Sequence, residues 1–115
     1  MVNKVDVGNR IKTLREKSNL SKELLSGFLD IGVDQLSKIE AGDAAITSDA
    51  VEELSDLFFC PMDYLLSGGK EEPEFVFVLQ GLNPTVESLK NLSQLNKIAK
   101  NQFFMDDLGE VPKWS

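Results

Sequence analysis

Apolar residues recur at three- and four-residue spacing in two short, adjoining segments between residues 21 and 42. The apolar positions are Leu24, Leu25, Phe28 and Leu29 in the first segment, and Leu36 and Ile39 in the second. This spacing puts the side chains of each segment on one face of a helix. Ser21 is a favourable N-cap for the first helix, Gly42 is a typical end for the second, and Asp30 between them tolerates the left-handed backbone of a corner. The pattern predicts two short helices joined by a tight turn.

Further helices are predicted on both sides of this pair. Residues 7–17 carry an inner stripe made by Val7, Ile11 and Leu14. After a loop at residues 43–47, Thr47 or Ser48 can cap a fourth helix that runs to about residue 59, and Pro61 suits the first turn of a short fifth helix. A glycine-rich, acidic stretch at residues 68–74 then indicates a boundary. We therefore expect a five-helix domain in residues 1–69 and a C-terminal extension in residues 70–115.

The extension begins with an unbroken apolar run from Phe75 to Leu79, rich in β-branched and aromatic residues, which favours a strand or an extended segment. Asn83, Pro84 or Thr85 can open a last, long helix that ends near Gly109. Its apolar positions include Val86, Leu89, Leu92, Leu95, Ile98 and Phe103. The predicted fold class is all-α, with one extended segment before the long helix.

The paired helices begin with Leu20-Ser21-Lys22 and close with Leu36-Ser37-Lys38-Ile39-Glu40-Ala41-Gly42. This segment resembles the helix-turn-helix of the Xre or Cro/cI-type, lambda-repressor-like proteins, and the resemblance extends from about Val7 to Leu66. In that family the arginine at the position of Arg15 pairs with the glutamate at the position of Glu40. A contact between Arg15 and a DNA phosphate is the alternative.

The resemblance implies binding to double-stranded operator DNA, with the second helix of the pair in the major groove. Val33 would touch a thymine methyl group, Asp34 would accept from cytosine, and Lys38 would donate to guanine. Ser21, Lys22 and the amides near Gly32 would hold phosphates. The predicted DNA-binding residues are Ser21, Lys22, Gly32, Val33, Asp34, Gln35, Ser37 and Lys38. The function implied is a sequence-specific transcriptional regulator of the repressor type.

The charge of the chain opposes this function. The formal net charge is −7, and residues 1–69 hold 7 basic against 12 acidic residues, whereas affinity for DNA usually comes from basic side chains at phosphates. The loop where relatives often carry lysine or arginine reads Asp43-Ala44-Ala45. A helix-turn-helix module for protein interaction, antitoxin-like or controlled by a regulatory protein partner, with weak or lost DNA binding, therefore stays open as the alternative.

Catalysis and metal binding are not expected. The chain has no histidine and one cysteine, Cys60, so it lacks a zinc site, a disulfide and the commonest general base. Glu52, Glu53 and Asp56 are expected to form the solvated face of a helix. We expect no cofactor. No apolar run approaches the roughly 20 residues of a membrane span, and there is no signal peptide, so the expected location is cytoplasmic.

Residues 75–105 carry more apolar surface than a small domain normally exposes. A single helix-turn-helix covers one half-site, and repressors of this type bind symmetric operators as dimers. We therefore expect residues 75–105 to form a homodimer. The alternative is that the long helix folds back onto its own domain.

Overall fold

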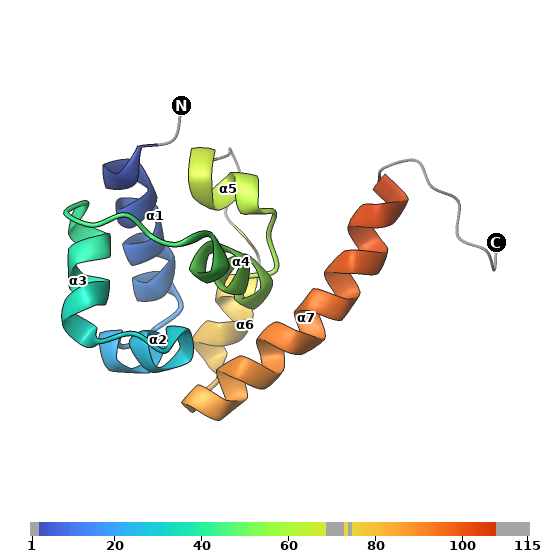
Figure 1. Ribbon diagram of the computed structural model, residues 1–115. Coiled ribbons are helices and arrows are strands. Elements are labelled where there is room, and N and C mark those ends of the chain that lie inside the picture. The colour runs from blue at the N-terminus through green and yellow to red at the C-terminus, as the bar shows by residue number, and fades with distance from the viewer. Residues whose placement is uncertain (1–2, 69–72, 74, 108–115) are drawn as a thin grey trace.

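The structure is a computed structural model that describes residues 3–68, 73 and 75–107, with side chains described up to residue 100. The regular elements in the described residues are all helices (Figure 1). They are α1 (Lys4–Lys17), α2 (Lys22–Leu29), α3 (Val33–Ala41), α4 (Ser48–Leu57), α5 (Met62–Ser67), α6 (Phe75–Gly81) and α7 (Val86–Asp107). The predicted all-α class is confirmed.

The ends of the first helices follow the local signals in the sequence. The hydroxyl of Ser21 accepts a hydrogen bond from the amide of Leu24 at the start of α2, and Thr47 accepts from Ala50 at the start of α4. Asp30 ends α2 in the left-handed conformation, with φ of 61°, and Gly42 ends α3 with φ of 83°. These helices therefore begin and end close to the predicted residues, except that α1 begins at Lys4, three residues before the predicted start, with Asn3 as its N-cap.

One hydrophobic core joins the five-helix part to the helices that follow it. Its members from α1 to α5 include Ile11, Leu14, Leu25, Leu36, Leu54, Leu57, Phe58 and Leu65, and its members from α6 and α7 are Val76, Leu79 and Leu89. Helix α1 approaches α3 so closely that a Cβ at Gly8 would collide with the carbonyl oxygen of Ile39. The predicted boundary between residues 69 and 70 lies outside the described residues, and the core contains side chains from both sides of it.

The extended conformation predicted for Phe75 to Leu79 is wrong, because these residues form α6. Val76 and Leu79, three residues apart, are buried, whereas Phe77 and Val78 between them are exposed. This is the periodicity of a helix with one face against a core. A helix also satisfies its backbone hydrogen bonds internally, which a strand without a neighbour cannot do.

Helix α7 begins where the sequence indicates, because the hydroxyl of Thr85 accepts from the amide of Ser88 at 3.1 Å. Its first part packs against α4 and α2, and its far part extends away from the body, on the side opposite α3 (Figure 1). Leu89 is fully buried, but Leu95 and Ile98 are each 63% exposed. The long helix therefore folds back onto its own domain through only part of its apolar surface. Gly109 lies outside the described residues, and Phe103 lies outside the described side chains.

Polar contacts continue the packing of α7 beyond Leu89. The ammonium of Lys100 donates to Asp56 Oδ1 at 3.0 Å, to Ser55 Oγ at 2.9 Å and to the carbonyl of Cys60 at 3.0 Å. Asn96 donates to the carbonyl of Leu57 at 3.3 Å. We call this set of contacts the Lys100 clamp. It satisfies carbonyl groups at the C-terminal end of α4 and orients α7 along that helix.

Candidate nucleic-acid interface

The turn between α2 and α3 is held by backbone hydrogen bonds. The amide of Asp30 donates to the carbonyl of Gly27 at 3.2 Å, and that of Ile31 donates to Ser26 at 3.0 Å. Gly32 is the N-cap of α3, where it supplies no side-chain cap and where a Cβ would meet open space. The first amides of α3 therefore lack a side-chain acceptor, which suits contact with an anion.

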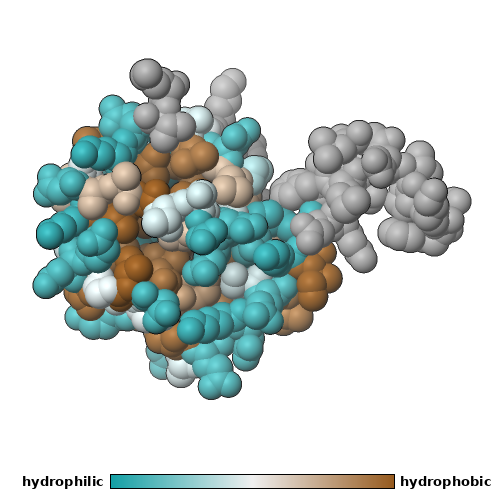
Figure 2. Space-filling model, viewed as in Figure 1, coloured by the Kyte–Doolittle hydropathy of each residue, from teal (hydrophilic) through white to brown (hydrophobic). Residues whose placement is uncertain are grey.

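Helix α3 presents two different faces. Leu36 and Ile39 are buried in the core, while Asp34, Gln35 and Lys38 are exposed. Of the other predicted DNA-binding residues, Ser21 and Gly32 are exposed, and Lys22, Val33 and Ser37 are partly buried. The outer side of α3, at the left of Figure 2, is largely hydrophilic. The structure thus brings the predicted residues together on the surface formed by α2 and α3.

Lys22 and Ser37 are hydrogen-bonded to one another across this surface. The ammonium of Lys22 donates to the hydroxyl of Ser37 at 3.4 Å, which links the start of α2 to the middle of α3. Two of the predicted DNA-binding residues are therefore hydrogen-bonded to one another in this structure. The ammonium of Lys22 keeps two further donors and the hydroxyl of Ser37 can still donate its proton, so both can contact DNA while this bond stays in place.

The orientation of α3 is fixed by an ion pair with α1. Arg15 Nε donates to Glu40 Oε2 at 2.7 Å, Arg15 Nη2 donates to Glu40 Oε1 at 3.2 Å, and both side chains are buried. Arg15 Nη1 also donates to the carbonyl of Leu20 at 3.0 Å, just before α2. This two-point pairing is the strong geometry of arginine and carboxylate. It confirms the predicted pair and excludes the alternative of an arginine directed at phosphate in this structure.

Two further basic residues stabilise the scaffold through contacts that the sequence pattern does not indicate. Arg10 Nη1 donates to the carbonyl of Leu65 at 2.7 Å, and so satisfies the end of α5. Lys100 pairs with Asp56 in the Lys100 clamp. The solvated face expected for Asp56 is therefore wrong, because this carboxylate is buried at 5% exposure, whereas Glu52 and Glu53 are exposed. Basic side chains favour the C-terminal ends of helices, but the sequence alone does not show which helix end lies next to a given basic residue. Lys38 on α3 is flanked in sequence by two exposed acidic residues, Asp34 on the same helix and Asp43 in the loop that follows it.

Comparison with known families assigns this arrangement. Residues 11–65 match the model of a family described as helix-turn-helix. This part of the chain is similar to helix-turn-helix domains. The matched region runs from α1 to α5 and leaves α6 and α7 outside it. Neither the curated proteins nor the solved structures give a significant match to the chain.

The helix-turn-helix match supports a DNA-binding regulator, and this family is not a family of enzymes. Within residues 3–68, 73 and 75–107, no group of three or more His, Cys, Asp or Glu residues is placed to hold a metal ion. Among the helices described here, none has the length and apolar character needed to cross a membrane.

Proposed function

We propose that this protein is a sequence-specific transcriptional regulator of the repressor type, which reads operator DNA with α3. The observation that carries the proposal is the exposure of Asp34, Gln35 and Lys38 on one side of a helix whose end is fixed by the Arg15–Glu40 pair. A recognition helix must present its side chains in a defined orientation, because base contacts depend on hydrogen-bond geometry.

The exposed side chains have complementary donors and acceptors on base edges. Lys38 suits the O6 and N7 atoms of guanine, Gln35 suits adenine, and Asp34 accepts from the amino group of cytosine. Ser21, Lys22 and the free amides after Gly32 lie at the helix starts, where related motifs contact phosphates. Val33 and Ser37, which are partly buried, would add apolar and hydroxyl contacts beside them.

We further propose that the protein acts as a homodimer through α6 and α7. Phe77 on α6 is 67% exposed, and Leu95 and Ile98 on α7 are exposed to a similar degree. Figure 2 shows a hydrophobic area on the side formed by α7. Since the far part of α7 and α3 lie on opposite sides of the molecule (Figure 1), dimerisation there favours half-sites separated by several helical turns.

Fluorescence anisotropy with DNA from upstream of its own gene, measured against salt, tests the DNA contacts. Lys38→Ala should cost roughly 1 to 3 kcal/mol and relax preference at one base pair. Lys22→Ala should weaken binding to all sequences alike and lower the salt slope by about one unit. Asp43→Lys should strengthen binding without changing preference. If Lys38→Ala and Lys22→Ala both bind every fragment as the wild type does, α3 is not the reading element.

Sedimentation of the full-length chain tests the dimer. The double variant Leu95→Lys/Ile98→Lys should be monomeric at concentrations where the wild type is dimeric, and should bind the operator much more weakly. Val5→Lys is a matched control, because Val5 is an exposed apolar residue on α1. A wild-type protein that is monomeric at micromolar concentration contradicts the dimer. Point variants are preferable to truncation after residue 69, which would remove Val76, Leu79 and Leu89 from the core.

The second candidate function is a protein-interaction module with weak DNA binding. It is favoured by the acidic residues Asp34 and Asp43 on either side of Lys38, which repel phosphates. The salt series separates the two functions. A DNA-reading domain loses affinity steeply as salt rises and prefers one sequence, whereas the interaction module shows no sequence preference at any salt concentration.

A further inference from the structure

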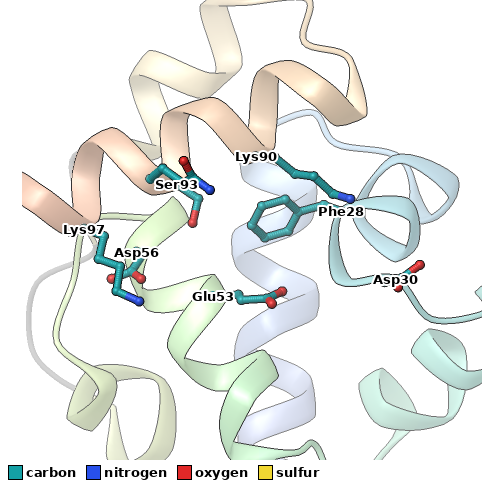
Figure 3. A pocket seen from close by; sticks show the side chains of 8 residues that line it. Phe28, Asp30, Glu53, Asp56, Lys90, Ser93 and Lys97 are labelled. Atoms are coloured by element: carbon teal, nitrogen blue, oxygen red, sulfur yellow. The ribbon is translucent and has the colours of Figure 1, made fainter.

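A cleft of about 380 Å³ lies where the end of α2, the outer side of α4 and the first part of α7 meet (Figure 3). Its volume falls within the roughly 300 to 1,000 Å³ typical of small-molecule sites. The cleft lies outside the proposed DNA-reading residues and outside the Leu95 and Ile98 surface. Among its lining residues, Phe28 supplies an aromatic ring and most of the others are charged.

The two sides of the cleft carry opposite charges. Asp30 lies at the end of α2 and Glu53 lies on α4. Lys90 and Lys97 project from α7, about two helical turns apart (Figure 3). In the described part of the chain, no ion pair joins these lysines to these carboxylates. Asp56 also lines the cleft, but its charge is offset by Lys100. The walls therefore face one another as unpaired cations and anions, with space between them.

Partial burial and nearby carboxylates both disfavour the ionised form of Glu53. The pKa of Glu53 is raised by partial burial first and then by the nearby carboxylate of Asp49, with a further contribution from Asp30, while Lys90 lowers it. A cationic group placed between Asp30 and Glu53 would offset this repulsion. A positive charge in the cleft, in addition to that of Lys90, would therefore favour the ionised form of Glu53.

Ser93 adds a polar group that has no partner within the described residues. The residue is only 8% exposed, it lines the cleft, and its hydroxyl points into it (Figure 3). Other buried helical serines behave differently: Ser26 donates to the carbonyl of Glu23 at 3.0 Å, and Ser55 donates to that of Glu52 at 2.8 Å. Buried polar groups are normally hydrogen-bonded, so the hydroxyl of Ser93 is available to a ligand.

We propose that this cleft binds a small zwitterion of the α-amino-acid type. Its ammonium group lies between Asp30 and Glu53, and its carboxylate accepts from Lys90 or Lys97 and from the hydroxyl of Ser93. Its side chain rests on the ring of Phe28. A ligand with both charges is required, because a simple anion would face the carboxylates and a simple cation would face the lysines.

Binding here would connect two parts of the molecule that the proposed function uses. Asp30 forms the left-handed corner between α2 and α3, and Lys90 and Lys97 belong to the helix that carries Leu95 and Ile98. An amino acid in the cleft would contact both the helix-turn-helix part and α7. It would thereby change the fraction of molecules competent for operator binding. This regulatory consequence rests on the proposed DNA binding, whereas ligand binding itself does not.

Isothermal titration of the full-length protein, without DNA, tests the site. Each of the common L-amino acids is titrated separately, and the tightest is then compared with its carboxamide and its N-acetyl derivative. We expect saturable binding of at least one amino acid, and affinities at least about ten-fold lower for both derivatives, because each has lost one charge. Absence of saturable binding at millimolar concentrations for every amino acid overturns the proposal, and so does a derivative that binds as tightly as its parent amino acid.

Variants locate the binding. Glu53→Gln, Lys90→Gln and Ser93→Ala should each lower the affinity at least several-fold, with melting temperatures checked in parallel. Glu52→Gln is the matched control for Glu53, since Glu52 is exposed on the same helix but does not line this cleft, and Lys12→Gln on α1 is the control for the lysine. Equal losses in the variants and the controls would overturn the assignment. Because no DNA is present, a failure here is distinct from a failure of operator binding.

Discussion

The helix-turn-helix part, α1 to α5, and the C-terminal part, α6 and α7, use their apolar residues differently. In the first part most apolar side chains are buried against one another, and polar side chains cap the starts of α2 and α4. In the second part Val76, Leu79 and Leu89 are buried, but Phe77, Leu95 and Ile98 remain exposed. The first part shares its core with Val76, Leu79 and Leu89 of the second, whereas the second part is only half covered by its own chain and retains surface for another molecule.

The polar contacts show the same contrast. Arg15 and Glu40 form a buried, two-point pair inside the helix-turn-helix part. The Lys100 clamp joins the two parts and lies near the point where α7 leaves the body, with the side chain of Lys100 13% exposed. Loss of the first pair should therefore damage the whole domain, while loss of the second should mainly release α7.

The largest effect is expected for the Arg15–Glu40 pair. Arg15→Ala or Glu40→Ala leaves a buried charge without its partner and should lower the free energy of unfolding by about 3 to 5 kcal/mol. The double variant should lose less than the sum of the single losses, because the two residues are in contact. Urea denaturation measures all three, with Lys12→Ala on the exposed side of α1 as control. Additive losses would show that the pair contributes no coupling.

The next effect compares two leucines of α7. Leu89→Ala removes a fully buried side chain and should cost about 2 to 5 kcal/mol. Leu95→Ala should change the unfolding free energy of the monomer by no more than about 0.5 kcal/mol, as exposed substitutions usually do. Thermal or urea melts at low protein concentration measure the unfolding free energy of the monomer without a contribution from dimerisation. A small loss for Leu89→Ala would mean that α7 is not part of the folding unit.

A smaller effect is expected at the Lys100 clamp. Lys100→Ala leaves the buried carboxylate of Asp56 and the carbonyl of Cys60 without a donor, at a cost of about 1 to 3 kcal/mol. The end of α7 should open first, which increases the reaction rate of the buried Cys60 thiol with a thiol reagent. Lys97→Ala, one turn earlier, is the control. If the thiol reacts at the wild-type rate in Lys100→Ala, the clamp does not hold α7 in place.

The smallest effect concerns pH. Burial, the largest influence, and Asp56 raise the pKa of the Cys60 thiol from 9.0 to about 11, while Lys100 lowers it. The folded state therefore holds the thiol proton more tightly than the unfolded state does. The stability linked to this proton is fully present below pH 9.0 and is lost as the pH rises through about 11. One pH unit above the ordinary thiol pKa, the free energy of unfolding should have fallen by about 1.4 kcal/mol.

Urea melts across this range, compared with melts of Cys60→Ala, isolate the contribution of the thiol. The variant is less stable at every pH because it loses buried volume, but its stability should fall less between pH 9.0 and higher values. Parallel curves for the two proteins would show that Cys60 ionises as readily in the folded state as in the unfolded chain.

The sequence by itself determined the helix-turn-helix part, because its signals are local. Ser21 caps the helix that follows it, Asp30 occupies the left-handed corner, and Gly42 ends α3, each through bonds or backbone angles within a few residues. The Arg15–Glu40 pair is not local, and the sequence indicated it only through the family resemblance. The eight predicted DNA-binding residues were found on one surface, but the bond between Lys22 and Ser37 was not foreseen.

The tertiary structure decided the C-terminal part. The run from Phe75 to Leu79 is apolar at every position, so it contains no period that separates a strand from a helix, and contact with the core selected the helix. In α7 apolar residues lie around much of the circumference, and the surface of α4 decided that Leu89 is buried and Leu95 is not. The same docking created the cleft, because Glu53 and Lys90 are far apart in the sequence and face one another only when α7 lies against α4.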